Sequence, residues 1–337
     1  MDMMALLRAL APLHRSLACA ATDEAFEILL REVPGARIES LPSGSKAWTW
    51  TIPQRWELES ATVRAGGKTL IDAKEHHLHA VNYSQPFKGT VTRKELLAHL
   101  HTNPKRPNAI PFMFHYYKKD WGFCVPHSWL KRFKAPSYDV EIRARFEDGP
   151  FKTFSAFLPG RRSETIVLAS NICHPTQAND SLTGVAAAVD VFKRLAARTE
   201  RKYSYLLLVV PETVGSVAYL SRHPEIIKDC VGAVFTEMLG TQGPLVLQKS
   251  RRGDTYWDAL LAAALEGSGL KHKTVGWLES ASNDERVFDR PGVDIPPPSM
   301  TRYPYPEYHS SDDHVGLIDS KRLAEGRDVL QAFVDLA

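Results

Sequence analysis

The sequence predicts an α/β protein with three αβα layers, a mostly parallel mixed central sheet and an inserted small β-rich domain. After Gly160, near-continuous apolar segments alternate with segments of helical period, which suits a parallel sheet covered by helices on both faces. Between 51 and 149, short alternating segments are separated by Gly, Pro and Asp, a pattern typical of β structure. We therefore expect a main αβα domain from residues 1–50 and 150–337 and an insert over residues 51–149.

The individual elements follow from the same periodicities. The leucines of residues 1–21 recur at helical spacing, and residues 21–33 form a second expected helix with Thr22 as its cap. The apolar face of that helix consists of Phe26, Ile28, Leu29 and Val33. After Gly160, strands are expected at 164–170, 203–212 and 231–239, and helices at 181–198, 214–223, 256–267 and 320–337.

The composition indicates an ordinary globular protein. The 337 residues are 44% hydrophobic and 24% charged, and 42 Lys and Arg nearly balance 39 Asp and Glu, so nothing points to a nucleic-acid partner. The four cysteines lie far apart, which suits a reducing compartment. No stretch reaches the roughly 20 apolar residues that span a bilayer. We expect a cytoplasmic protein without membrane contact, and the sequence leaves homo-oligomerisation open.

Potential metal ligands or catalytic groups follow the three clearest strands. His174 comes directly after 164–170, and Asp180 opens the following helix. Glu212 ends the second strand and Glu237 the third, while His309 lies in the late segment "PEYHSSDDH". The carboxyl ends of parallel strands meet at one edge of a sheet, where ligands gather, so these side chains are expected close together.

Each residue alone has an ordinary explanation, but the set favours metal. Asp180 is a good candidate for a helix N-cap, and His309 for an exposed loop residue. Several partly desolvated carboxylates together would repel one another unless a cation neutralised them. Imidazole and carboxylate ligands with an open position suit catalytic Zn²⁺, and one carboxylate left off the metal can act as general base.

Other reactive side chains fit less well. His76, His77 and His79, and also His99 and His101, lie in the expected insert without strand-end carboxylates, so their use as ligands is not favoured. Cys173 is expected as a buried thiol, because successive strand residues face opposite ways. The sequence contains neither a GxSxG nucleophile elbow nor a Walker-type loop, which excludes the common serine hydrolase and P-loop classes.

These motifs resemble the M28-type zinc aminopeptidases. His174 followed by "DSLTG", "ETVG" at 212–215, "EMLG" at 237–240 and "HSSDD" at 309–313 match the family's ligand motifs. Over nearly the whole length, the chain looks like the bacterial aminopeptidase-like domain proteins formerly grouped as a domain of unknown function. That resemblance implies the zinc-peptidase fold and a link to polysaccharide or secondary-metabolite biosynthesis.

Carried over by motif, the resemblance implies one or two zinc ions held by His174, Asp180, Glu237 and His309, with Asp180 as the bridge. Glu212 would be the general base. Thr213 stands where the family has a second glutamate ligand, which weakens the site that holds His309. Other departures are Thr176, which replaces a supporting aspartate, and Glu285, which stands where "SNDERVF" would match a histidine.

The function expected is hydrolysis of an amide or peptide bond in a small molecule or short peptide. The expected substrate-binding residues are Arg302, Tyr308, Asp284 and Asp313, with Arg302 a candidate partner for a substrate carboxylate. Tyr303 and Tyr305 are further candidates to line the pocket, and Trp121, Tyr116 and Tyr117 could supply a wall from the insert. Two alternatives stay open: a metal-dependent deacylase or acyl transferase on the same scaffold, and a metal-poor binding protein, which Thr213 favours.

Overall fold

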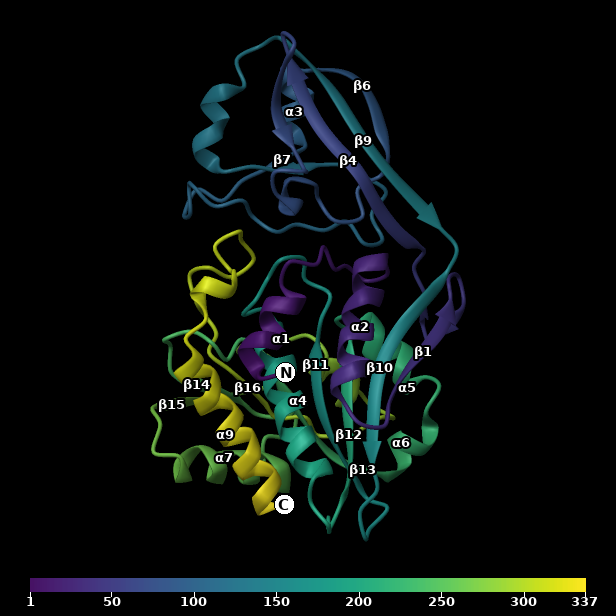
Figure 1. Ribbon diagram of the computed structural model, residues 1–337, viewed down its shortest axis with the longest axis vertical. Coiled ribbons are helices and arrows are strands. Elements are labelled where there is room, and N and C mark those ends of the chain that lie inside the picture. The colour runs from purple at the N-terminus through teal and green to yellow at the C-terminus, as the bar shows by residue number, and fades with distance from the viewer.

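An eight-stranded mixed sheet forms the centre of the larger domain, in the order β1-β10-β12-β11-β13-β16-β14-β15. The computed structural model describes residues 1–337 (Figure 1). Four of the seven neighbouring pairs are parallel, so the predicted mostly parallel mixed sheet is confirmed. The strands are β1 (Ala36–Pro42), β10 (Pro150–Leu158), β11 (Thr165–Asn171), β12 (Ser204–Val210), β13 (Cys230–Thr236), β14 (Leu245–Gln248), β15 (His272–Val275) and β16 (Ser299–Thr301).

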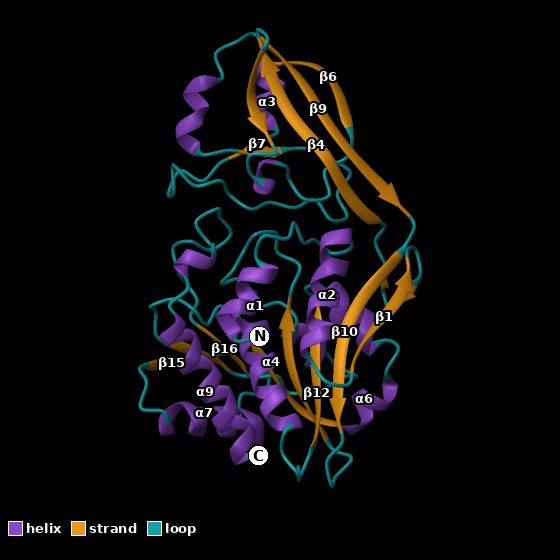
Figure 2. Cartoon of the chain, viewed as in Figure 1, coloured by secondary structure: helices purple, strands orange, loops and turns teal.

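Helices cover both faces of this sheet, which completes the predicted three layers (Figure 2). One face packs against α1 (Met3–Leu10), α2 (Ala20–Glu32), α4 (Leu182–Ala196), α7 (Tyr256–Gly267) and α9 (Ser320–Leu336). The other face packs against α5 (Val214–Leu220), α6 (Pro224–Asp229) and α8 (Glu285–Phe288). Side chains of β11 alternate between the two cores, because Ile166 and Leu168 enter the first and Val167 and Ala169 the second.

The insert is built on a separate antiparallel sheet in the order β5-β4-β9-β6. Its strands are β4 (Arg55–Ala65), β5 (Lys68–Asp72), β6 (Phe87–Thr92) and β9 (Ser137–Glu147). The shorter elements of the chain are β2 (Lys46–Ala47), β3 (Trp50–Thr51), α3 (Arg93–Ala98), β7 (Leu100–His101), β8 (Phe123–Cys124) and the 3₁₀ segments His77–His79, His127–Arg132 and Val315–Leu317. The arrow of β11 points toward the insert, which therefore lies over the carboxyl ends of the parallel strands (Figure 2).

One expected helix cap is wrong. Thr22 lies inside α2, whose N-cap residue is Cys19 and makes no side-chain cap bond. The Thr22 hydroxyl instead donates to the Ser16 carbonyl at 2.6 Å and accepts from the Ser16 amide at 3.0 Å. The segment before α2 folds back along the helix, and this contact uses the hydroxyl that the sequence offered as a cap. The predicted apolar face is correct, since Phe26 and Leu29 are fully buried.

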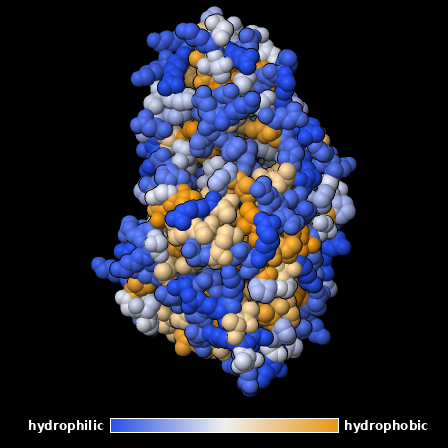
Figure 3. Space-filling view, viewed as in Figure 1, coloured by the Kyte–Doolittle hydropathy of each residue, from blue (hydrophilic) through white to orange (hydrophobic).

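The outer surface combines hydrophilic and hydrophobic residues. In the space-filling view, hydrophobic residues gather in the middle of the molecule, below the insert, among mostly hydrophilic ones (Figure 3). None of the helices combines the length and the apolar character needed to cross a membrane.

A close approach between α4 and β13 brings the start of this helix to the end of that strand. A Cβ atom on Gly184 would lie 1.9 Å from the carbonyl oxygen of Thr236 and 2.7 Å from the Cα of Glu237. Both are backbone atoms of a buried strand end, which has little freedom to shift. Only glycine permits this spacing, which holds Asp180 and Glu237 in the same neighbourhood.

We predict that Gly184→Ala lowers the free energy of unfolding by about 1–3 kcal/mol, because the added methyl group overpacks this contact. Gly267→Ala is the matched control, since it lies in α7 and its Cβ would meet nothing within 4 Å. That change should leave stability unchanged or slightly raised. Urea unfolding followed by circular dichroism measures both variants, and equal midpoints would contradict the prediction.

Candidate metal and catalytic site

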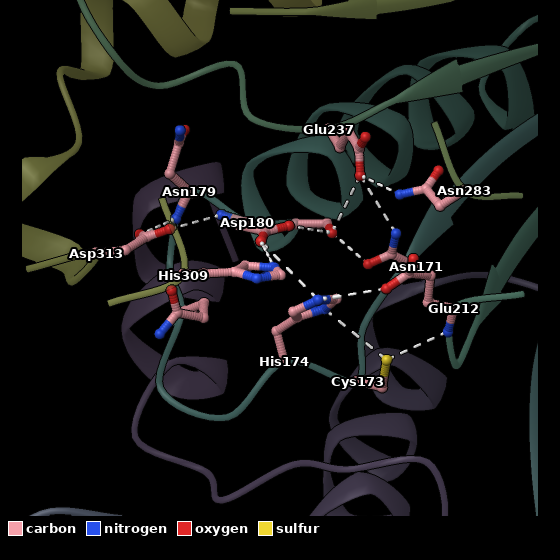
Figure 4. Close-up of polar contacts among 12 residues, drawn as sticks. Asn171, Cys173, His174, Asn179, Asp180, Glu212, Glu237, Asn283, His309 and Asp313 are labelled. Carbon is pink, nitrogen blue, oxygen red and sulfur yellow. Dashed lines mark hydrogen bonds and ion pairs between the residues drawn. The ribbon is translucent and has the colours of Figure 1, made fainter. Parts of the chain in front are cut away.

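Residues from four separate segments converge at the carboxyl ends of β11, β12 and β13. His174 follows β11, Asp180 precedes α4, Glu212 follows β12 and Glu237 follows β13. His309 arrives from the loop between β16 and α9. Figure 4 shows the side chains of His174, Asp180 and His309 turned toward one another. Parallel pairing of the three strands accounts for this convergence, because their carboxyl ends share one edge of the sheet.

Asp180 lies between the two histidines. Its Oδ2 atom is 3.1 Å from Nε2 of His309 and 3.9 Å from Nε2 of His174. The same Nε2 of His174 is 3.3 Å from Oε2 of Glu212. The side chains of His174 and Asp180 are only 3% exposed, whereas those of His309 and Glu212 are 26% and 28% exposed. The open side of the site is therefore the side of His309 and Glu212.

Asp180 is not the helix cap that its position suggests. The N-cap residue of α4 is Ser181, without a side-chain cap bond, and the helix begins at Leu182. Oδ1 of Asp180 accepts a 3.1 Å hydrogen bond from the Ser181 hydroxyl, and Oδ2 remains directed at the histidines. Burial acts to raise the pKa of Asp180, but the adjacent His174 and His309 outweigh it and lower this pKa to about 2.

Glu237 lies beside this group and is fully buried. Its Oε2 atom accepts hydrogen bonds from the side chains of Asn283 at 3.0 Å, Asn171 at 3.3 Å and Ser181 at 3.4 Å. Burial raises the pKa of Glu237 well above its usual value, and the charge of Asp180 adds to this effect. Asn171, Ser181 and Asn283 thus support the site, and motif matching did not identify them.

Three buried atoms of this cluster have no hydrogen-bond partner: Oδ2 of Asp180, Oε1 of Glu237 and Nε2 of His309. Unpaired buried polar atoms are costly, so the two that face each other, Oδ2 of Asp180 and Nε2 of His309, indicate a place for a ligand. The ligand atoms of His174, Asp180 and His309 all lie within 4.8 Å of one another. Two imidazoles and a carboxylate match the donor set of a catalytic zinc site, so the residues fit this metal.

A second set of three potential ligands contains Cys173, His174 and Glu212. The Cys173 thiol is fully buried, which raises its pKa well above the usual value and disfavours the thiolate that binds metal. Its Sγ atom instead accepts the Glu212 amide at 3.2 Å. Cys173 therefore fixes the backbone of Glu212, as expected for a buried thiol.

The turn that carries Glu212 is held on its other side by Asp284. Thr213 has a φ of 59°, in the left-handed region, and its amide donates to Oδ1 of Asp284 at 2.9 Å. The Ser216 hydroxyl donates to the same oxygen. Burial raises the pKa of Glu212, and the neighbouring His174 opposes that rise. Glu212 is thus a fixed carboxylate with an affinity for protons above that of an exposed glutamate.

The histidine loop is held by an arginine that the sequence did not single out. The guanidinium of Arg15 is fully buried and donates to the carbonyls of Ile172 at 2.8 Å, His174 at 2.6 Å and Gln177 at 3.1 Å. Burial lowers the pKa of Arg15 to about 10. Phe112 from the insert also contacts the site, with its ring centroid 5.2 Å from that of His174 and 5.1 Å from that of His309.

Three expected substrate-binding residues have other partners, so these expectations are corrected. Arg302 is 3% exposed, and its guanidinium donates to the carbonyls of Leu239 and Gly243 and to Glu325. Asp284 is fully buried beneath the Glu212 turn. Asp313 is 1% exposed and accepts the Tyr305 hydroxyl at 2.6 Å. Their hydrogen-bonding capacity serves the protein itself rather than a substrate.

Asp313 organises the loop before α4. Oδ1 accepts the amides of Ala178 at 3.0 Å and Asn179 at 2.6 Å, and Oδ2 accepts that of Asp180 at 3.1 Å. Tyr308 is the fourth expected residue and lies at the site, since its ring stacks on His309 with centroids 3.9 Å apart. It remains a candidate for substrate contact.

A cavity of about 740 Å³ adjoins the site. Glu212 and Thr213 form part of its wall, and Tyr116 and Tyr117 of the insert form another part. Trp121 does not reach it and is stacked instead on His99, with centroids 3.8 Å apart. The insert therefore supplies one wall of the open space beside Glu212.

The other histidines do not form a comparable cluster. His77 and His79 belong to a 3₁₀ segment, and Nδ1 of His79 is 2.7 Å from the Cys124 carbonyl. Nδ1 of His99 is 2.8 Å from the Trp121 carbonyl. No three metal-binding side chains come together among these residues. They are part of the packing of the insert.

The family described as "Domain of unknown function (DUF4910)" matches residues 4–337. A protein of Clostridium acetobutylicum, whose name describes a polysaccharide biosynthesis protein with an aminopeptidase-like domain, is 32% identical over 323 residues, which cover 95% of this chain and 74% of the relative. A solved C. acetobutylicum structure, named as a peptidase, has a TM-score of 0.93 and 30% identity over 99% of this chain and 79% of its own.

More distant solved structures share the fold. The Bacillus subtilis zinc aminopeptidase has a TM-score of 0.73 at 13% identity and covers 99% of this chain and 94% of its own. A peptidase M28 precursor of Shewanella amazonensis has a TM-score of 0.68 at 12% identity, with coverages of 98% and 92%. This protein has the fold of the M28 aminopeptidases and belongs to the DUF4910 family.

Proposed function

We propose that this protein is a zinc-dependent hydrolase that cleaves an amide or peptide bond in a small substrate. The observation that supports this most strongly is the position of Asp180, whose unpaired Oδ2 lies between His174 and His309 with Glu212 next to His174. A buried carboxylate oxygen left without a hydrogen bond, between two imidazoles and beside a second carboxylate, is costly without a cation.

We propose one tightly bound ion rather than two. His174, Asp180 and His309 would hold it. Glu237, the fourth ligand that the motif implies, has one oxygen without a hydrogen bond. Thr213 supplies no carboxylate to a second position, and Cys173 is occupied by the Glu212 amide. When bound, zinc would polarise the substrate carbonyl and acidify a water molecule.

Glu212 would act as the general base. Desolvation in its partly buried position raises its pKa, which brings its proton affinity closer to that needed for transfer near neutral pH. Glu212 takes a proton from the attacking water as the new carbon–oxygen bond forms. It then delivers that proton to the amine as the carbon–nitrogen bond breaks. The products are a carboxylic acid and an amine, and Glu212 returns to its starting state.

The similar proteins suggest two substrate classes, aminoacyl amides and N-acylated amino sugars. The fold neighbours include a zinc aminopeptidase, which favours aminoacyl amides. The name of the C. acetobutylicum relative refers to polysaccharide biosynthesis, which favours N-acylated amino sugars as substrates. Aminoacyl anilides and N-acetylated amino sugars, assayed in parallel for release of amine, distinguish a peptidase from a deacylase.

We predict that Glu212→Gln keeps its zinc but loses at least about a hundredfold in rate, because the amide cannot accept the proton of water. Zinc content is measured by mass spectrometry and rate with the best substrate of that comparison. The control is Glu200→Gln, an exposed glutamate that pairs with Arg161 far from the site. Full activity in Glu212→Gln would remove this residue from the mechanism.

His174→Ala and His309→Ala should each lose most of the bound zinc, since each removes one of three clustered ligands. His272→Ala on the edge strand β15 is the control and should bind zinc like the parent. Mass spectrometry after dialysis measures the metal-to-protein ratio, with about one ion expected in the parent protein. Parental zinc in both site variants would place the metal elsewhere.

Asp313→Asn should weaken zinc binding by about 10- to 100-fold, although Asp313 is not itself a ligand. An amide offers one acceptor atom where the carboxylate has two, so at least one backbone amide of 178–180 loses its partner. Competition with a chromophoric chelator measures the affinity. The neighbouring Asp312→Asn breaks only a partly exposed pair with Arg106 and should leave affinity intact. Equal affinities in the two variants would show that the loop needs no such support.

A further inference from the structure

The cavity beside Glu212 has an aromatic side that is unusually exposed. Phe114 and Tyr117 are 43% and 53% exposed, although both are large hydrophobic residues. They line the cavity together with Trp50, whose ring makes an edge contact with Tyr117 at a centroid distance of 5.8 Å. Exposed aromatic faces around a concavity favour a ligand with an apolar or ring-shaped body. Glu212 on the same wall brings that ligand to the proposed general base.

The wall of the cavity also carries two arginines without acidic partners. Arg286 belongs to α8, Arg290 follows the end of that helix, and both line the cavity. Neither guanidinium lies within ion-pair distance of a carboxylate. Arg286 donates to the Ser282 carbonyl, and Arg290 lies 4.7 Å above the Trp48 ring. Neither guanidinium therefore has an ion-pair partner within the protein.

The remaining lining adds little negative charge. Glu212 is the only carboxylate of the cavity wall, and its neighbour Thr213 is neutral. Lys118 also lines the cavity, but its ammonium group already contacts Asp120 at 2.5 Å. An unpaired guanidinium presents a planar fork of donors that matches the oxygens of a carboxylate or phosphate. The charge that is missing from the protein can come from a ligand.

We propose that the substrate is an anionic amide: a carboxylate or phosphate group binds Arg286 and Arg290, and an apolar or ring-shaped body contacts Trp50, Phe114 and Tyr117. The scissile amide then lies toward Glu212. This inference rests on the proposed function only for the position of the amide, because the aromatic and cationic sides of the cavity are independent of zinc. An amide with a positive charge at this end is disfavoured by the same arginines.

Binding of three matched probes tests the inference. N-benzoylglycine carries an aromatic ring, an amide and a carboxylate; N-benzoylglycinamide is its neutral counterpart; and the phosphate ester of N-benzoylethanolamine carries a phosphate. Calorimetry with zinc-loaded Glu212→Gln protein avoids turnover. We expect at least one of the two anions to bind about tenfold or more tightly than the neutral amide, through charge-assisted hydrogen bonds. The tighter of the two anions identifies the class of oxyanion.

The double substitution Arg286→Gln/Arg290→Gln, in the same background, should bring the ratio of anion affinity to neutral-amide affinity close to one. Zinc content and the thermal unfolding temperature should stay unchanged. Arg161→Gln/Arg162→Gln removes the same charge from an exposed loop and should keep the preference. The inference is overturned if the neutral probe binds as well as both anions, if the preference survives in Arg286→Gln/Arg290→Gln, or if none of the three binds at about 10 mM.

Repeating the titrations after removal of metal with a chelator separates this inference from the proposed function. An arginine-dependent preference for anions in metal-free protein shows that the arginines, rather than zinc, recognise the anion. Zinc binding and amide hydrolysis without such a preference would leave the proposed function standing and refute the anionic substrate. An anion preference in a protein that neither binds zinc nor hydrolyses amides would support the anion site and refute the proposed function.

Discussion

The parallel pairing of β11 with β12 on one side and β13 on the other is the constraint on which the site depends. Asn171 at the end of β11 is paired with Val210 at the end of β12, and Ala169 is paired with Phe235 near the end of β13. The chain therefore leaves three strands at one edge, and His174, Glu212 and Glu237 follow within a few residues. A shift of one residue would turn these side chains to the other face of the sheet.

The second requirement is a carboxylate kept free of the hydrogen bonds that its position in the chain would normally give it. An aspartate before a helix usually caps it, yet Asp180 leaves α4 without a side-chain cap. Asp313 binds the three backbone amides that precede the helix, and Arg15 binds the carbonyls of the preceding loop. With the backbone satisfied by others, Oδ2 of Asp180 can face the histidines.

The insert completes the site from the opposite side. Phe112 contacts both histidines, and the aromatic residues from 114 to 117 line the cavity beside Glu212. The main domain contributes the reactive groups and the two free arginines, whereas the insert contributes apolar surface. The proposed general base and the proposed anion site thus use different side chains of the cavity wall, which allows one to be tested without the other.

The sequence by itself determined the fold class, the long helices and the strand ends that carry His174, Glu212 and Glu237, because hydrophobic periodicity is a local property. It also predicted that Asp180 and His309 belong with them. Tertiary structure decided the use of each remaining polar side chain. The sequence is equally compatible with a substrate contact or an internal support at Arg302, Asp284 and Asp313. It also predicts a helix cap at both Thr22 and Asp180. Which partner a polar group finds depends on segments distant in the chain, such as residues 13–16 beside β11 or 309–313 beside α4, and such pairings leave no periodic trace in the sequence.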